Sequence, residues 1–154
     1  MDKHIKAPFD REEVKNLKAG DYVYIDGIVY SARDAAHKRM YDSIIESGCK
    51  DASGTELYEK KIVPIDLNGN VIYYLGPTPA KPGQVIGSAG PTTSSRMDKY
   101  TPLILSKGLC GMIGKGKRSP EVIQAIKDNG AVYLAAVGGA GALLSKCIKE
   151  SEVI

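Results

Sequence analysis

Residues 90–98 have the sequence Gly-Pro-Thr-Thr-Ser-Ser-Arg-Met-Asp, a turn crowded with hydroxyl side chains and one arginine. A second loop, Ile113-Gly114-Lys115-Gly116-Lys117-Arg118, follows at a spacing that permits one helix between two loops at the same edge of a sheet. Hydroxyl groups and cations gathered at one sheet edge are suited to binding an anion. We therefore expect these two loops to form a site for a small anion.

The segments around these loops show strand and helix patterns. Alternating β-branched and aromatic residues predict strands, and apolar residues at helical spacing, with capping residues at the ends, predict helices. The predicted strands lie in 22–30, with a bulge or hairpin turn at Gly27, in two runs of 61–75 joined as a hairpin by Asn68-Gly69-Asn70, in 84–87 and in 131–137. The predicted helices cover 33–45, ended by Gly48, a segment from near Arg96 to Lys107, one from Ser119-Pro120-Glu121 to Asn129, and a last one ending near Ile148.

The order of these elements predicts the fold class. Strands cluster first and then alternate with helices, which favours an α/β domain with a mixed sheet and helices packed against it. A chain of 154 residues is long enough to bury one core without disulfides or metals. We expect a single domain over residues 1–154.

Composition and charge exclude several classes of function. The 21 basic and 18 acidic residues are too evenly balanced for a nucleic-acid-binding face, and the aromatic content of 6% offers no stacking platform for single strands. We interpret Lys115, Lys117 and Arg118, the densest basic cluster, as a solvated face unless a ligand contacts it. No apolar run approaches the length of a membrane span, and the N-terminus lacks a signal-peptide pattern, so we expect a cytoplasmic protein.

The three cysteines, Cys49, Cys110 and Cys147, are far apart and form no Cys-x-x-Cys pair. Their number argues against a disulfide framework, and their spacing argues against a self-contained zinc or iron-sulfur site. We therefore predict no metal ligands on this chain.

Two glycine-rich segments resemble nucleotide-binding loops but lack residues that these motifs require. Gly138-Gly139-Ala140-Gly141 has no third glycine at Leu144 and no acidic residue about twenty positions further on, which favours a plain strand-to-helix turn. The segment from Gly111 to Gly116 lacks the glycine spacing and the Ser or Thr of a phosphate loop. The glycines around Lys115 leave two interpretations open, close approach to a ligand or a simple turn.

A second group of polar residues begins the first predicted helix. Arg33, Asp34 and His37 could cluster at the helix N-terminus, where an arginine can bind a carboxylate with two parallel hydrogen bonds. His37 taken alone is more typical of a structural histidine. Thr92, Thr93 and Arg96 of the opening stretch fit a carboxylate or phosphate cradle, although a helix cap would need only one of the hydroxyls.

These motifs together resemble a known family. Gly20-Asp21, Arg33-Asp34-Ala35-Ala36-His37-Lys38-Arg39, Leu75-Gly76-Pro77-Thr78-Pro79, the 90–98 block and Ile113-Gly114-Lys115-Gly116 are similar, in order, to the β subunit or C-terminal domain of iron-sulfur class I fumarases and L-tartrate dehydratases. The resemblance covers about residues 14–146. It implies a swivelling β/β/α domain that works with an α subunit carrying a 4Fe-4S cluster on three cysteines, for which this chain has no equivalents.

The resemblance also implies roles for individual residues. Arg33, Arg96, Lys115 and Thr93 match substrate-binding positions, and Asp34 and His37 match supporting ones. Thr92 matches a threonine proposed as the catalytic base, which would need activation, for example by Lys115.

The implied activity is the reversible hydration of fumarate to L-malate, a reaction of the tricarboxylic acid cycle, in a heteromeric hydro-lyase. The partner's cluster would act as the Lewis acid, and the cations of this chain would bind the carboxylates of the C4 substrate. L-Tartrate dehydratase is an alternative with the same chemistry, and a non-catalytic anion-binding module is an alternative of another class. The isolated chain could form a homodimer.

Overall fold

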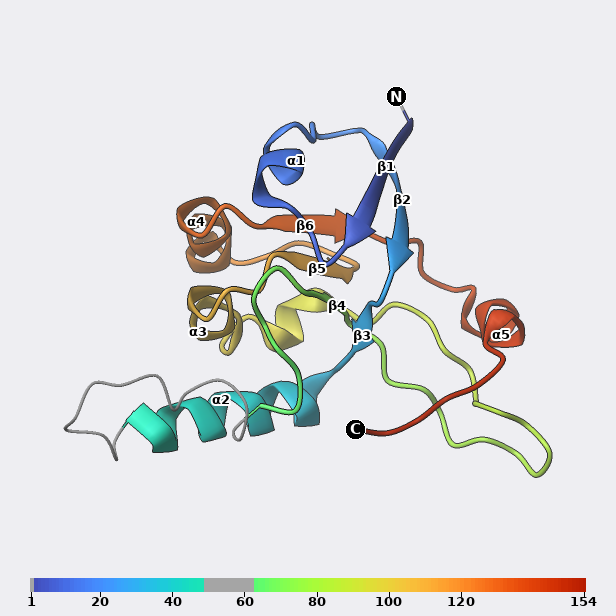
Figure 1. Ribbon diagram of the computed structural model, residues 1–154. Coiled ribbons are helices and arrows are strands. Elements are labelled where there is room, and N and C mark those ends of the chain that lie inside the picture. The colour runs from blue at the N-terminus through green and yellow to red at the C-terminus, as the bar shows by residue number, and fades with distance from the viewer. Residues whose placement is uncertain (1, 49–62) are drawn as a thin grey trace.

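The computed structural model describes residues 2–48 and 63–154. Two parallel sheets organise this part of the chain (Figure 1). The strands are β1 (Asp2–Ala7), β2 (Tyr22–Gly27), β3 (Tyr30–Ser31), β4 (Val71–Tyr73), β5 (Gly111–Gly114) and β6 (Val132–Ala135). The helices are α1 (Arg11–Lys15), α2 (Asp34–Gly48), the 3-10 turn η1 (Ser94–Met97), α3 (Thr101–Ser106), α4 (Pro120–Asp128), α5 (Gly141–Leu144) and the 3-10 turn η2 (Ser145–Cys147).

The larger sheet has four strands in the order β3-β4-β5-β6, and all its pairs are parallel. Successive residues of a strand point to opposite faces. On one face, Ile72 of β4 and Met112 of β5 are fully buried with Met40, Ile44, Ile104 and Leu105 of the helices. On the other face, Val71 packs with residues of the smaller sheet. Both faces of the sheet are therefore covered, as is usual for parallel sheets.

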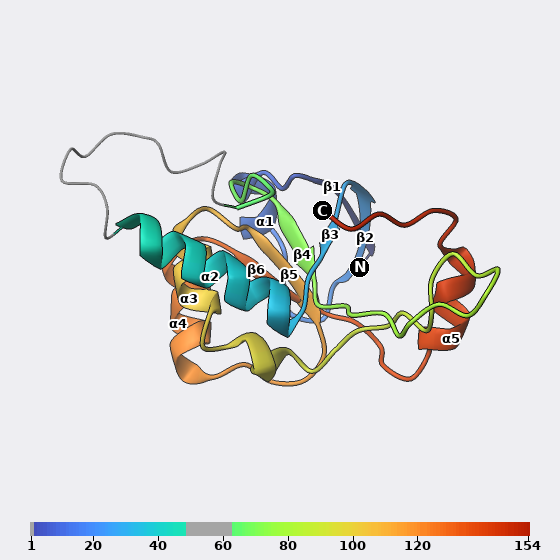
Figure 2. The same ribbon diagram turned by 90° about the horizontal axis from the view of Figure 1, so that it is seen from below.

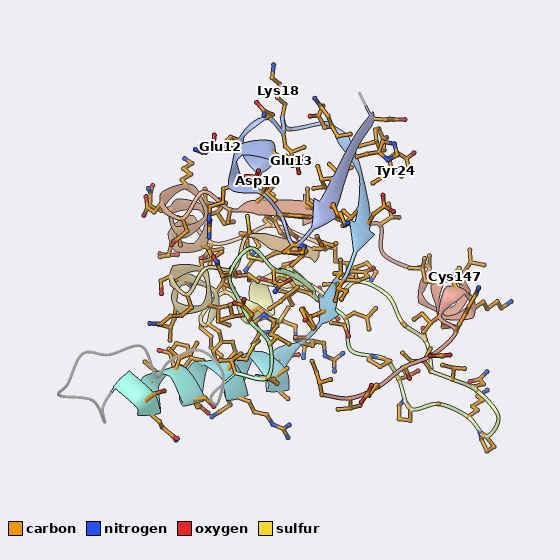
Figure 3. All side chains as sticks on the ribbon, viewed as in Figure 1. Asp10, Glu12, Glu13, Lys18, Tyr24 and Cys147 are labelled. Carbon is orange, nitrogen blue, oxygen red and sulfur yellow. The ribbon has the colours of Figure 1, made fainter. Side chains whose placement is uncertain are left out.

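The second layer is the two-stranded parallel sheet of β1 and β2 with the short helix α1. Ile5, Phe9 and Val14 bury their side chains together with Val71 of β4 and Cys110, which directly precedes β5. Asp10 caps α1 by accepting a hydrogen bond from the backbone N–H of Glu12. Figure 3 labels Asp10, Glu12 and Glu13 at this end of α1.

The third layer consists of α2, α3 and α4, which cover the opposite face of the larger sheet (Figures 1 and 2). The short helix α5 lies apart from these three, beside the long loop that follows β4 (Figure 2). The backbone N–H of Ala89 in this loop bonds to the carbonyl of Gly141 in α5. The order of layers is sheet, sheet, helices, which is the three-layer β/β/α arrangement that the resemblance implies.

The α/β class and several elements are confirmed. The helix predicted over 33–45 is α2, Ser119 caps α4 by accepting from the backbone N–H of Val122, and 131–137 contains β6. The predicted break at Gly27 is also present, with φ of 101°. However, the break separates β2 from β3, which belong to different sheets, and makes no hairpin.

The sheet differs from the prediction in its pairing. The expected mixed sheet is wrong, because every pair of described strands is parallel and antiparallel pairing is limited to the isolated bridge between Leu75 and Pro91. The expected hairpin across 61–75 is also wrong. Residues 61 and 62 lie outside the described residues, 63–67 form no strand, and β4 has both edges occupied by β3 and β5.

Two further predictions are wrong. The segment 84–87 is irregular, and the helix predicted from near Arg96 to Lys107 is divided into η1 and α3. The division falls just before Pro102, which stands in the first turn of α3 because proline has no N–H for a preceding helical turn. The strands β1 and β5 were not predicted, because β1 is rich in charged residues and β5 has glycine at both ends.

Candidate functional site

The predicted site residues gather where the parallel strands of the larger sheet end. Arg33 follows β3, Gly76 follows β4, Lys115 follows β5 and Gly138 follows β6. Backbone hydrogen bonds continue the sheet at this edge, from Ala32 N–H to the Tyr73 carbonyl and from Tyr74 N–H to the Ile113 carbonyl. We call the loops after these four strands, together with residues 90–98, the carboxyl edge. Ligand sites of open parallel sheets lie at this edge.

Asp34 joins two arginines at the carboxyl edge. Its Oδ1 accepts a hydrogen bond of 2.9 Å from Nε of Arg96, and its Oδ2 lies 3.2 Å from Nε of Arg33. The hydrogen bond connects residues that are 62 positions apart in the sequence. Among the described residues, no hydrogen bond reaches the terminal nitrogens of either guanidinium. Each arginine therefore keeps two terminal nitrogens free to donate to a ligand.

Gly76 provides the surface on which Arg33 lies. A Cβ at this position would stand only 2.7 Å from Nε of Arg33 and 2.8 Å from its Cζ. Any larger residue would displace the guanidinium. The glycine in Leu75-Gly76-Pro77-Thr78-Pro79 is thus needed because the Arg33 guanidinium packs against its backbone. The sequence alone does not reveal this contact.

The two loops of the opening motif are bonded to each other and to the sheet. The N–H of Thr92 donates to the Tyr74 carbonyl, at 2.7 Å, and the Thr92 carbonyl accepts from the N–H of Lys115, at 3.2 Å. Thr93 and Lys115 form an isolated parallel bridge, and Ser94 N–H donates to the Lys115 carbonyl. The structure therefore brings Thr92, Thr93 and Lys115 together, with Thr93 exposed and the other two half-buried.

The side chain of Lys115 lies along the glycine turn after β6. A Cβ on Gly138 would stand 3.1 Å from both Cδ and Nζ of Lys115. The turn at Gly138-Gly139-Ala140-Gly141 is the strand-to-helix turn that we expected, and its first glycine leaves room for the lysine. The ammonium group is held against Gly138, so its direct contact with the Thr92 hydroxyl stays a prediction.

His37 does not join the exposed cluster. Its ring is fully buried, Nδ1 lies 2.9 Å from the Arg33 carbonyl, and Nε2 is buried without a hydrogen-bond partner among the described residues. Because a carbonyl only accepts, Nδ1 carries the proton. The pKa of His37 is lowered from 6.5 to about 4, with burial as the largest cause; Arg118 also lowers it, whereas the hydrogen bond to the Arg33 carbonyl and the charge of Asp34 raise it. His37 therefore supports the backbone of Arg33 as a neutral ring.

Arg118 is buried, which corrects its assignment to a solvated basic cluster. Its Nε donates to Asp98 at 2.7 Å, and its terminal nitrogens donate to Tyr74 Oη and Thr101 Oγ1. The guanidinium also lies over the rings of Tyr74 and Tyr133. Arg118 thus ties the last residue of the 90–98 stretch to the second loop from inside the fold.

Tyr133 makes a further connection between the two loops. Its hydroxyl donates to the Gly116 carbonyl at 3.0 Å and lies 2.8 Å from Oγ of the buried Ser94. Since the phenol proton is used at Gly116, the serine is the donor to Tyr133. Nothing in the sequence marked Tyr133, Ser94 or Asp98 for these contacts, because their partners come from distant segments.

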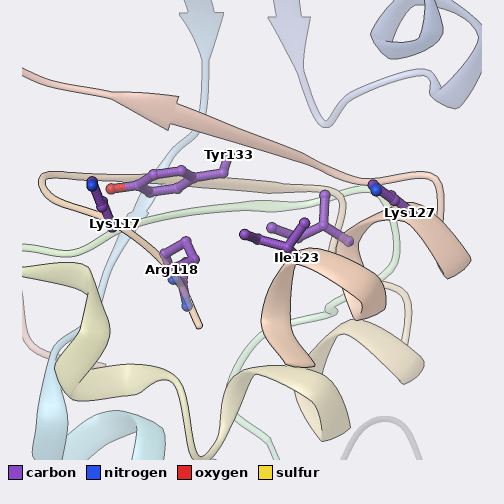
Figure 4. A pocket seen from close by; sticks show the side chains of 6 residues that line it. Lys117, Arg118, Ile123, Lys127 and Tyr133 are labelled. Atoms are coloured by element: carbon purple, nitrogen blue, oxygen red, sulfur yellow. The ribbon is translucent and has the colours of Figure 1, made fainter. Parts of the chain in front are cut away.

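A hollow of about 410 Å³ is lined in part by Tyr133 (Figure 4). It is separate from the candidate site, since its lining contains none of the predicted site residues. The lining residues are Lys117, Arg118, Ile123, Ile126, Lys127 and Tyr133.

The donor groups at the carboxyl edge do not fit an iron-sulfur cluster. They are guanidinium, ammonium and hydroxyl groups, and the carboxylate of Asp34 is engaged by two arginines. Residues 2–48 and 63–154 contain no group of three His, Cys, Asp or Glu that could hold a metal. Cys110 is buried, and Cys147 is exposed on η2, distant from α1 and Tyr24 (Figure 3). Cys49 lies outside the described residues.

The helices of the described residues include none long and apolar enough to cross a membrane. A parallel sheet whose carboxyl edge presents two arginines, a lysine and threonines defines an α/β protein with a cationic carboxyl edge. Residues 2–154 match the model of the family described as Fumarase C-terminus. The chain belongs to this family, as the resemblance predicted.

Three relatives agree with this assignment. A provisionally named fumarate hydratase class I of Geobacillus stearothermophilus is 38% identical over 96% of this chain and 26% of its own length. A provisionally named L(+)-tartrate dehydratase subunit beta of Methanocaldococcus jannaschii is 39% identical over 92% of this chain and 68% of its own length. The L(+)-tartrate dehydratase subunit beta of Escherichia coli is 27% identical over the whole chain and 70% of its own length. The chain therefore spans about a quarter of the fumarate hydratase and about two thirds of each beta subunit.

Proposed function

We propose that this chain is the β subunit of a heteromeric hydro-lyase that interconverts fumarate and L-malate. The observation that carries the proposal is the pair of arginines on Asp34, each with free terminal nitrogens, at the edge that also presents Lys115 and Thr92. A guanidinium binds a carboxylate through two parallel hydrogen bonds. Two such groups suit a substrate with a carboxylate at each end.

The proposed roles follow from the chemistry of dehydration. A proton leaves C3 of malate and the hydroxyl leaves C2, so that a C2–C3 double bond forms and one water is released. Arg33, Arg96, Lys115 and Thr93 bind the carboxylates and stabilise the negative charge that builds up as the C3 proton leaves. Thr92 is the proposed acceptor of that proton, and its backbone is held by Tyr74 and Lys115.

The 4Fe-4S cluster that the resemblance implies belongs, in this proposal, to an α subunit. The described residues of this chain offer no suitable ligand set for it. Two relatives carry the name subunit beta, which supports a hetero-oligomer with an α subunit as its partner. This chain on its own would then bind a dicarboxylate without turning it over.

L(+)-Tartrate dehydration is the second candidate. The observation that favours it is that two relatives, one of them 39% identical to this chain, carry the name L(+)-tartrate dehydratase subunit beta. Tartrate adds one hydroxyl to malate, and the same two arginines would bind its carboxylates.

The test is reconstitution of the complete enzyme. The chain is co-expressed with the α subunit encoded in the same genome, iron and sulfide are restored without oxygen, and the complex is assayed with fumarate, L-malate and L(+)-tartrate. Turnover of fumarate and malate by the complex, and by neither subunit alone, is the expected result. Turnover of tartrate alone would select the second candidate. Failure with all three substrates, in a complex that holds its cluster, would leave the non-catalytic anion-binding module.

A further inference from the structure

Asp34 contacts both arginines through the same atom, the Nε nearest the side-chain stem. A guanidinium has a second donor set in its two terminal nitrogens. The hydrogen bond to Oδ1 fixes the rotation of the Arg96 guanidinium, whereas the buried Oδ2 makes no hydrogen bond and attracts Arg33 as an ion pair. Both terminal pairs are left open, so the carboxylate orients Arg96 and holds Arg33 beside it.

The exposure of these groups shows that the ion pairs contribute little to folding. The side chains of Arg33, Arg96 and Asp34 are 43%, 54% and 36% exposed. Surface ion pairs of this kind contribute little to stability. Yet the contacts of Asp34 join the start of α2 to η1. In addition, only a glycine at position 76 leaves room for the guanidinium of Arg33. An arrangement that is so specific and adds so little stability is suited to ligand binding.

The charges of the candidate site also fit one substrate class. Arg33, Arg96 and Lys115 carry three positive charges, and Asp34 removes one, which leaves a net charge of +2. This charge is equal and opposite to that of a C4 dicarboxylate with both groups ionised. Asp34 stands in the first turn of α2, where the positive end of the helix favours a carboxylate.

We propose that Asp34 is a positioning residue that holds Arg33 and Arg96 at a fixed separation, with their terminal nitrogens directed at the two carboxylates of one substrate. This inference rests on the proposed function. It makes Asp34 a determinant of specificity for dicarboxylates over monocarboxylates, although Asp34 itself touches no substrate.

The experiment compares Asp34→Asn with Asp42→Asn in the reconstituted complex. Asp42 is a matched control because it also lies on α2 and forms a surface ion pair, with Lys38. Steady-state kinetics gives KM and kcat, and calorimetry measures binding of succinate, an unreactive C4 dicarboxylate, and of butyrate. Thermal unfolding of each variant reports any effect on the fold.

Asp34→Asn is expected to raise KM and to weaken succinate binding, each by about tenfold or more, because a charge-assisted hydrogen bond is lost. Its preference for succinate over butyrate should shrink, while its melting temperature stays close to that of the wild type. The Asp42→Asn variant should have the KM, the ligand binding and the melting temperature of the wild type. The direction of the change in KM distinguishes a positioning role from a purely electrostatic one. Removing a negative charge would strengthen anion binding if Asp34 acted only through the electrostatic field, so a lower KM would overturn the proposal.

Kinetics of Asp34→Asn equal to those of Asp42→Asn would also overturn the proposal. An inactive wild-type complex would contradict the proposed function instead, and the succinate measurement would then still decide whether Asp34 positions the arginines. Asp34→Glu provides a second variant, since it keeps the charge and moves the carboxylate. We expect its KM to lie between those of Asp42→Asn and Asp34→Asn.

Discussion

Arg118 and Arg96 lie in neighbouring loops of the same motif, but their surroundings are opposite. The Arg118 side chain is 2% exposed, and it donates from Nε to Asp98 and from both terminal nitrogens to neighbouring groups. The Arg96 side chain is 54% exposed and bonds to Asp34 through Nε alone. A guanidinium with every direction occupied holds the fold together, whereas one with free terminal nitrogens is available to a ligand. The comparison separates the structural cations of the carboxyl edge from the binding ones.

The largest effect in this comparison is expected from Arg118→Ala. Removing one partner of a buried ion pair leaves the other charge uncompensated and costs about 3–5 kcal/mol. We expect a loss of that size in the free energy of unfolding, measured by urea denaturation with circular dichroism. Arg96→Ala is the control and should lose less than about 1 kcal/mol. A similar loss in both variants would contradict the division between structural and binding arginines.

The second largest effect is expected at His37, whose ring is bonded to the Arg33 carbonyl and is influenced by the charges of both Arg118 and Asp34. Its pKa is lowered from 6.5 to about 4, with burial as the largest cause; Arg118 also lowers it, whereas the Arg33 carbonyl and Asp34 raise it. Between these two pH values the unfolded chain binds a proton that the folded chain does not. Stability should therefore fall as the pH decreases from 6.5 to 4, by up to about 3 kcal/mol.

Urea denaturation across this pH range measures the slope. His37→Leu should lose this part of the pH dependence, because the titrating group is gone. His4→Gln is the control, since it also removes one histidine, but an exposed one that stacks on Tyr24 of β2. An equal slope in the wild type and in His37→Leu would refute the role of His37.

The catalytic side of the comparison is tested by Arg96→Ala. We expect kcat/KM of the reconstituted complex to fall by about a hundredfold, because a bidentate contact to a substrate carboxylate is removed. Arg39→Ala is a matched control, since Arg39 is an exposed arginine of α2 outside the candidate site. An unchanged kcat/KM in Arg96→Ala would remove Arg96 from the site.

The same contrast explains what the sequence could and could not predict. The helices α2 and α4 were predicted because their periodicity and caps are local signals, and Arg33, Thr92, Arg96 and Lys115 were found through short motifs. The burial of Arg118 could not be predicted, because Asp98, Tyr74 and Tyr133 come from separate segments and a run of basic residues normally lies in solvent. The parallel pairing of β4 was missed because Asn68-Gly69 has a local hairpin pattern, whereas the neighbours of β4 are set by tertiary packing.

The smallest effect is expected from Tyr133→Phe, which tests the link between the buried and the exposed region. The variant keeps the ring over Arg118 but removes the hydroxyl that joins Ser94 to the Gly116 carbonyl. We expect a loss of about 1 kcal/mol in the free energy of unfolding, the usual contribution of a hydrogen bond. Ser94→Ala removes the other partner, and the double variant completes a cycle measured by urea denaturation. Because both substitutions break one contact, the double variant should lose clearly less than the sum of the single losses. Additive losses would mean that Ser94 and Tyr133 act independently and that their contact does not help to hold the two loops together.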